Sequence, residues 1–143
     1  ASLGIPRAGI AMDGVTPVEF RNSAEGAYYV AIRHRNHLGF RTLQTVFCSK
    51  STTVLSFTDA SVPLYGTSAL RQVATGVYAM KSGDANRDGQ INAADRNLHW
   101  RLHNGQPLTY TTAASDFNFD GAVNTSDRDL FWRVNNSQQI QLD

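Results

Sequence analysis

The sequence predicts a mainly β fold with a small α part, in which an antiparallel β-sandwich is followed by a helical region built on two loops. Residues 1–82 alternate apolar and polar side chains in short runs separated by turn residues, a pattern typical of strands. Residues 83–143 instead repeat one loop-and-helix pattern at an offset of 32 residues. We therefore expect a domain boundary between Ser82 and Gly83, with one domain at 1–82 and a second at 83–143.

Short apolar runs mark the expected strands of the first domain. They lie at 15–20, 27–33, 42–48, 52–57 and 73–80, and Gly39, Asp59 and Gly66 mark turns between them. Strands of this length with short connections favour a small antiparallel sandwich.

Two twelve-residue segments, 84–95 and 116–127, carry the same polar pattern. Each has an oxygen-bearing side chain at positions one, three, five and nine, a glycine at six, a β-branched residue at eight and an aspartate at twelve. This is the pattern of a calcium-binding loop, in which oxygen ligands surround the ion. One copy can be an ordinary polar turn, because Asp, Asn and Gly favour turns. Two copies with equal spacing indicate two calcium sites.

The predicted ligands follow from these positions. The first site would use Asp84, Asn86, Asp88, Asn92 and Asp95 with the backbone carbonyl of Gln90, and the second Asp116, Asn118, Asp120, Asn124 and Asp127 with the carbonyl of Ala122. We expect Ile91 and Val123 to pair as a short strand contact between the loops. Carboxylates that converge without a cation repel one another, so metal is expected to be part of the fold.

A helix is predicted after each loop, at about 93–103 and 126–134. Apolar residues four apart, Leu98 with Leu102 and Leu130 with Val134, indicate the helical period, and Asn104-Gly105 is a stop signal. Trp100 and Trp132 occupy equivalent positions. They favour packing in the core or between domains, with a carbohydrate-stacking pair as the alternative.

Composition limits the classes of function. Net charge is +1, but residues 83–143 carry five Lys and Arg against eight Asp and Glu, and the acidity lies in the loops. No apolar run approaches the roughly twenty residues that span a bilayer, so membrane insertion is not expected, and neither is nucleic-acid binding. The start at Ala1 fits a processed, exported protein. His34 and His37 are expected to hydrogen-bond a turn rather than to bind zinc, and the absence of a recognisable catalytic motif predicts a non-enzyme.

The paired loops resemble the type I dockerin repeat, which binds two calcium ions and, in cellulosomes, docks into a cohesin. The stretch Ala27-Tyr28-Tyr29-Val30-Ala31-Ile32-Arg33-His34-Arg35-Asn36-His37-Leu38-Gly39, followed by Tyr65-Gly66-Thr67 and the loop at 83–86, resembles more closely a module near the C-termini of large secreted proteins of Bacteroidetes-type bacteria. In that module a β-sandwich half precedes a dockerin-like pair. The resemblance covers about 15–134. The helices differ from cohesin-binding dockerins in carrying Arg and Trp where Ser/Thr-type recognition residues usually stand.

Modules of this kind usually open with further strands, so we expect the sandwich to lack an edge strand. An open edge exposes backbone groups that a strand from another chain can pair with, and the candidate donors are residues 1–11 and 138–142. The expected function is an extracellular, calcium-stabilised structural or assembly module, a subunit of a cell-surface fibre or anchoring assembly formed by strand exchange. The alternative is a recognition module that binds a cohesin-like receptor or glycan.

Overall fold

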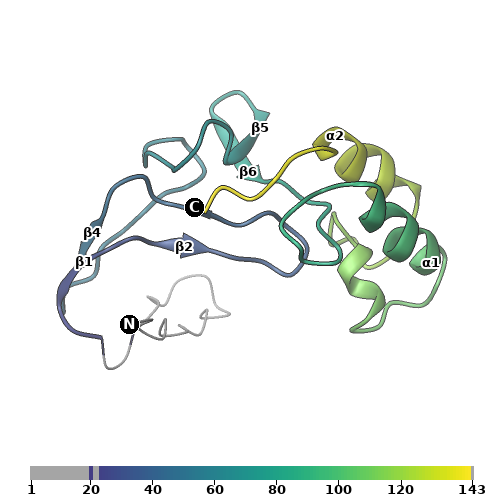
Figure 1. Cartoon of the computed structure of the whole chain (residues 1–143), viewed down its shortest axis with the longest axis horizontal. Coiled ribbons are helices and arrows are strands. Elements are labelled where there is room, and N and C mark those ends of the chain that lie inside the picture. Colours follow the sequence, from purple (N-terminus) through teal and green to yellow (C-terminus); the bar gives the residue numbers. More distant parts are fainter. Residues whose placement is uncertain (1–19, 21–22, 143) are drawn as a thin grey trace.

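The computed structural model describes residue 20 and residues 23–142. Within them the named strands form three two-stranded antiparallel sheets, and the helices of the two repeats lie side by side at the other end of the molecule (Figure 1). The pairs are β1 (Gly26–Tyr28) with β4 (Val46–Cys48), β2 (Ala31–Ile32) with β3 (Phe40–Arg41), and β5 (Leu70–Ala74) with β6 (Val77–Met80). A mixed fold of short antiparallel strands and helices is confirmed, whereas the face-to-face packing of a sandwich stays a prediction.

The strands are shorter than the apolar runs that predicted them. The run at 73–80 is not one strand, because β5 and β6 are joined by a turn in which Gly76 has a φ of 72°. Glycine adopts this left-handed conformation without a steric penalty, so the chain reverses in the middle of the run. Residues 52–57 contain no strand. Residues 15–19 lie outside the described part of the chain.

Each helix begins with two α-helical residues, at 93–94 and 125–126, continues as a π-helical segment and ends in a short α-helical one. η1 (Asp95–Trp100) continues into α1 (Arg101–His103), and η3 (Asp127–Trp132) continues into α2 (Arg133–Asn135), with the 3-10 turn η2 (Thr112–Ser115) in the connection. The first helix stops as predicted, before Gly105 with a φ of 73°, and Ser137 with a φ of 72° takes the equivalent place after the second. None of the helices at 23–142 has the length and apolar character to cross a bilayer.

The two helices bury equivalent residues. Asp95 and Trp100 are the buried residues of η1, and Asp127 and Trp132 those of η3. A π-helix has hydrogen bonds from i to i+5, and in its wider turn residues five apart, such as each aspartate and tryptophan, lie near the same side. The leucines and the valine whose spacing indicated the helical period are exposed.

The main hydrophobic cluster lies between the two repeats. It consists of Leu38, Ala85, Ile91, Trp100, Phe117, Val123 and Trp132. The burial of both tryptophans confirms the core-packing prediction. Leu38 alone comes from the N-terminal half, so this core belongs mainly to the loop-and-helix region.

The predicted strand contact between Ile91 and Val123 does not form. Ile91 accepts a hydrogen bond from the backbone N–H of Ser137 at 2.7 Å and donates one to the carbonyl of Gln138, whereas Val123 accepts one from Gly105 at 2.9 Å. Each loop thus pairs with the residue that follows the other repeat's helix. Their side chains still share the core, so the loops are joined by side-chain packing.

The C-terminal segment returns from α2 towards the strands (Figure 1). Ile140 donates its backbone N–H to the carbonyl of Gly89 in the first loop, Gln141 pairs with Phe40 in β3, and Leu142 is buried. One of the two candidate donor strands is therefore paired within its own chain.

Asn36 joins the N-terminal half to the first residue of both loops. Its backbone carbonyl accepts hydrogen bonds from Gly83 and Asp84, and its side-chain Nδ2 donates to the carbonyl of Asp116 at 2.9 Å. The side chain is fully buried. Removing it would leave a buried carbonyl without a donor.

We expect Asn36→Ala to lower the free energy of unfolding by about 1–3 kcal/mol, the cost of an unsatisfied buried polar group. Asn136→Ala, at an exposed asparagine, is the matched control and should change stability by less than about 0.5 kcal/mol. Urea unfolding measures both. Equal effects of the two substitutions would show that Asn36 does not hold the loops.

Candidate metal centre

The two predicted calcium loops have the same internal hydrogen bonds, residue for residue. At position one, Asp84 Oδ2 accepts the backbone N–H of Gly89 at 3.2 Å, and Asp116 Oδ2 accepts that of Gly121 at the same distance. Both glycines have a positive φ, 84° and 88°, which a side chain would strain. Glycine at position six therefore suits the conformation that each loop requires there.

The aspartate at position twelve closes each loop. Asp95 Oδ1 accepts the N–H groups of Ala85 and Asn86 at 2.8 and 3.2 Å, and its Oδ2 accepts that of Asn92 at 2.8 Å. Asp127 makes the equivalent three bonds in the second loop. Both carboxylates are fully buried. They hold the start of each loop against the start of its helix.

Positions three and five form consecutive side-chain turns. Asn86 Oδ1 accepts the N–H of Asp88, and Asp88 Oδ1 accepts that of Gln90. Asn118, Asp120 and Ala122 repeat the arrangement. Such turns favour a tight backbone in which several oxygens face one side.

The ninth residue of each loop caps the helix that follows. Asn92 Oδ1 accepts the N–H of Ala94, and Asn124 Oδ1 accepts that of Ser126, both at 2.7 Å. The predicted ligands at positions one, three, five, nine and twelve are therefore all tied into the hydrogen bonds of their own loop. The residues expected to supply the seventh-position carbonyl, Gln90 and Ala122, are exposed.

One carboxylate oxygen in each loop has no hydrogen-bond donor among the described residues. The two oxygens are Asp84 Oδ1 and Asp116 Oδ1. Both are buried, and they occupy equivalent positions in the two loops. A buried oxygen that accepts no hydrogen bond is costly unless a cation faces it. The donor set, carboxylate and amide oxygens with a backbone carbonyl, suits a hard ion such as calcium. The residues present therefore fit the metal.

The loops are not cages built from carboxylates alone. Within the described residues, no three His, Cys, Asp or Glu side chains converge as a metal-binding group. Part of the donor set is asparagine, and the side chains of Asn86 and Asp88 are bonded to each other through Nδ2 and Oδ2 at 2.9 Å. An ion has to compete with that bond and with its counterpart between Asn118 and Asp120.

Burial governs the titration of the loop carboxyls. Burial, and after it the negative charge of Asp95, raise the pKa of Asp84 to about 6. Burial also raises the pKa of Asp95 and of Asp127, against the backbone N–H groups that favour their ionised forms. Without a cation, the loops thus resist full ionisation.

The histidines at 34 and 37 pack on the second loop. His37 stacks on Phe119 with ring centroids 5.4 Å apart, and its Nδ1 lies 2.8 Å from Asn36 Oδ1. Burial, with the nearby His34 and Arg35, lowers the pKa of His37 to about 4. The two histidines thus hydrogen-bond within the segment 34–37, His34 with His37 and His37 with Asn36, as the sequence predicted for a turn.

Each repeat also supplies contacts that complete the other. Trp100 donates its Nε1–H to the carbonyl of Asn124 at 2.8 Å, and Trp132 donates to that of Asn92 at 3.0 Å. Sequence reasoning missed this exchange and the role of Asn36. The only sign of the exchange in the sequence is that the two tryptophans occupy equivalent repeat positions. That sign does not indicate which backbone carbonyl each tryptophan contacts.

The raised pKa of Asp84 predicts that the metal-free protein loses stability as pH rises. The folded protein prefers the protonated carboxyl, so this contribution is complete below the ordinary pKa of 3.8 and is lost as pH rises through about 6. In chelator, the melting temperature should fall between pH 5 and pH 7. Asp84→Asn should flatten that dependence. An unchanged slope in this variant would assign the pH effect to other groups.

Comparison with known proteins agrees with this geometry. The model of the dockerin type I domain matches residues 81–133, which hold both loops and nearly all of both helices. No curated protein and no solved structure matches the chain. The match covers the repeat and leaves most of the N-terminal half outside it. Residues 81–133 of this chain therefore form a dockerin type I-like module.

Proposed function

We propose that this chain is a calcium-stabilised module that docks to a partner protein through its dockerin-like part. The observation that carries the proposal is the buried, unpaired carboxylate oxygen at the first position of both loops. The match to the dockerin type I model supports the same reading. We assign the dockerin-like domain to 83–143 and the preceding domain to 1–82.

Each loop would hold one calcium ion with its own residues. The first set is Asp84, Asn86, Asp88, Asn92, Asp95 and the carbonyl of Gln90, and the second is Asp116, Asn118, Asp120, Asn124, Asp127 and the carbonyl of Ala122. Calcium would supply positive charge to the carboxylates, among them Asp84, Asp95 and Asp127, whose pKa burial raises. Residues 83–143 carry five basic and eight acidic side chains, so two ions would change their net charge from −3 to +1.

The outer faces of the helices offer a surface for the partner. Leu98 and Leu130 stand at equivalent positions and are 63% and 64% exposed, and Leu102 and Val134 are exposed one turn further along. Apolar side chains repeated on one helical surface are typical of protein-binding faces. We infer a cohesin-like receptor as the class of partner. The glycan alternative has less support, because both tryptophan rings are buried beneath arginines.

Calcium titration tests the two sites. By isothermal titration calorimetry we expect two ions per chain, and one ion after either Asp84→Ala or Asp116→Ala, because each substitution removes the unpaired oxygen of one loop. Asp129→Asn, outside the loops, should keep both ions. Two ions in an Asp84→Ala variant would refute the assignment of the first site.

A second candidate function, assembly by strand exchange, is favoured by the exposed sheets. Tyr28, Phe47, Val73 and Val77 lie on named strands and are each more than 40% exposed. A further strand at the edge of these sheets would widen them, and face-to-face packing of the widened sheets in a sandwich would cover these side chains. We propose residues 1–11 as the donor, since residues 138–142 already pair within the chain. The product would be a fibre or anchoring assembly at the cell surface.

Strand exchange predicts that deletion of residues 1–11 abolishes self-association. The comparison is a chain in which Leu3, Ile5 and Ile10 are replaced by Ser, which keeps the length but removes the apolar alternation. Light scattering and electron microscopy should show assemblies only for the unaltered chain. Assemblies that persist after the deletion would rule out this donor.

The proposed setting is extracellular, and the proposed role is non-catalytic. Extracellular calcium sites bind with dissociation constants of roughly 10⁻⁴–10⁻³ M, which suits a loop whose donors must first release internal hydrogen bonds. The acidic residues of the loops would be committed to the ion and would stay ionised.

A further inference from the structure

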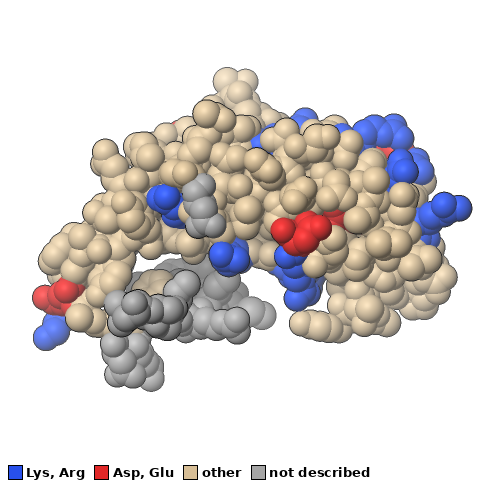
Figure 2. Space-filling view, in the orientation of Figure 1, with Lys and Arg blue, Asp and Glu red and all other residues tan. Residues whose placement is uncertain are grey.

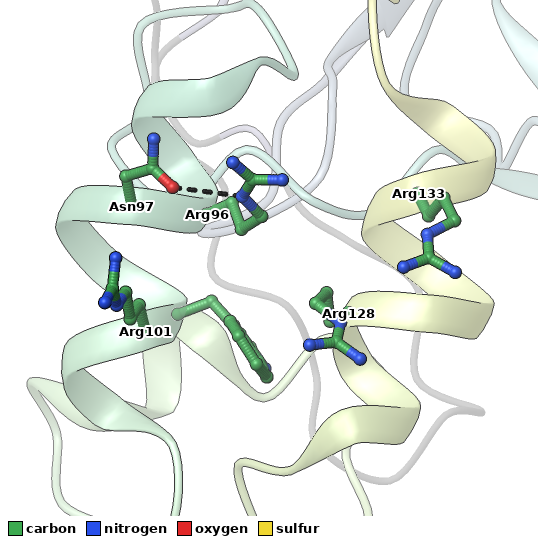
Figure 3. A pocket seen from close by; sticks show the side chains of 6 residues that line it. Arg96, Asn97, Arg101, Arg128 and Arg133 are labelled. Carbon is green, nitrogen blue, oxygen red and sulfur yellow. Dashed lines mark hydrogen bonds between the residues drawn. The ribbon is translucent and has the colours of Figure 1, made fainter.

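Four arginines line one pocket between the two helices. Arg96 and Arg101 come from the first helix and Arg128 and Arg133 from the second, and with Asn97 and Trp100 they line an open pocket of about 260 Å³ (Figure 3). Figure 2 shows Lys and Arg side chains gathered over this end of the molecule. Guanidinium groups that face a common space repel one another unless an anion lies between them.

Two of the arginines are held in place by the tryptophans of the opposite helix. Arg96 lies over the ring of Trp132 at 5.2 Å, and Arg128 lies over the ring of Trp100 at 4.8 Å. The rings are themselves anchored by the hydrogen bonds from their Nε1–H groups to the other loop. The guanidinium groups are thus positioned before any ligand arrives, which lowers the entropic cost of binding.

The second repeat provides a carboxylate for its own arginines. Asp129 accepts two hydrogen bonds from Arg128, from Nε and Nη2, both at 2.8 Å, and forms an ion pair with Arg133 at 3.0 Å. Both positive charges of this half therefore have a partner.

The first repeat has an amide where the second has that carboxylate. Asn97 stands at the position of Asp129, and its Oδ1 accepts a hydrogen bond from Arg96 Nε at 3.0 Å. The other end of the Asn97 amide is an NH₂ group, which cannot accept a hydrogen bond from an arginine as Asp129 Oδ2 does. Within residues 23–142, neither Arg96 nor Arg101 forms an ion pair. This half of the pocket carries two positive charges without a carboxylate.

We propose that the Arg96 and Arg101 side of this pocket receives an aspartate or glutamate side chain of the partner protein. The inference rests on the proposed docking function and names its contact chemistry. A carboxylate there would take the place that Asp129 takes in the second repeat, and it matches the planar guanidinium donors. The exposed Leu98 and Leu130 on the same helices favour a protein surface. A nucleic acid instead requires a long basic track along many phosphates.

The test uses the full chain with calcium and two capped peptides that differ only in having glutamate or glutamine at four positions. Arginine side-chain N–H signals are followed by NMR during the titration. We expect the glutamate peptide to bind at least about tenfold more tightly, the size expected for a charge-assisted hydrogen bond. Shifts should centre on Arg96 and Arg101, and binding should weaken as salt is added.

Two single substitutions make the test specific. Asn97→Asp supplies the missing carboxylate within the chain and should weaken the glutamate peptide about tenfold. Asp129→Asn frees the other arginine pair and should strengthen binding or add a second site. If the glutamate peptide binds no better than the glutamine peptide, or binds Asn97→Asp equally well, the proposal is overturned. Displacement of the peptide by an equal concentration of sulfate also overturns it, because the pocket would then be a simple oxyanion site.

Calcium stoichiometry, measured on the same samples, separates this proposal from the function on which it rests. Asn97 lies outside both loops, so Asn97→Asp should still bind two ions. A chain that binds no calcium would contradict the proposed function. A chain that binds calcium but does not distinguish the peptides would contradict only the acidic-contact proposal.

Discussion

The buried oxygens Asp84 Oδ1 and Asp116 Oδ1 are the constraint on which the rest of the structure depends. Every other carboxylate oxygen in the first loop accepts a hydrogen bond within that loop, and the second loop repeats the pattern. Burial without a donor raises the free energy of an ionised carboxylate, and either a proton or a cation relieves that cost. At neutral pH, a bound cation would therefore keep the loops closed. The loops in turn set the start of both helices.

The two repeats act as one unit because each supplies what the other lacks. The tryptophans donate to the opposite loop, the arginines rest on the opposite tryptophans, and Val123 and Ile91 each bond to the residue after the other helix. A single repeat would expose its tryptophan and leave its loop unsupported. Asn36 extends the same connection to the N-terminal half, since it bonds to the first residue of both loops. The proposed partner surface on the helices and the proposed metal sites in the loops are thus parts of one packed structure.

The sequence predicted what is local and missed what depends on distant residues. The loop positions, the glycines and the end of the first helix follow from ligand spacing and backbone preference over a few residues. The predicted pairing of Ile91 with Val123 was wrong. Ile91 pairs instead with residues 137–138, and no local pattern in the sequence indicates that contact. The leucine spacing predicted the helices but not their buried face, which carries an aspartate and a tryptophan five residues apart in a π-helical segment. The turn at Gly76 was hidden by the apolar residues on both sides of it.

The central claim is that one calcium ion faces each unpaired aspartate oxygen. Anomalous diffraction from crystals grown with calcium tests it most directly. The account predicts two anomalous peaks, one beside Asp84 Oδ1 and one beside Asp116 Oδ1. The absence of a peak at both oxygens, or peaks only at other carboxylates, would contradict it.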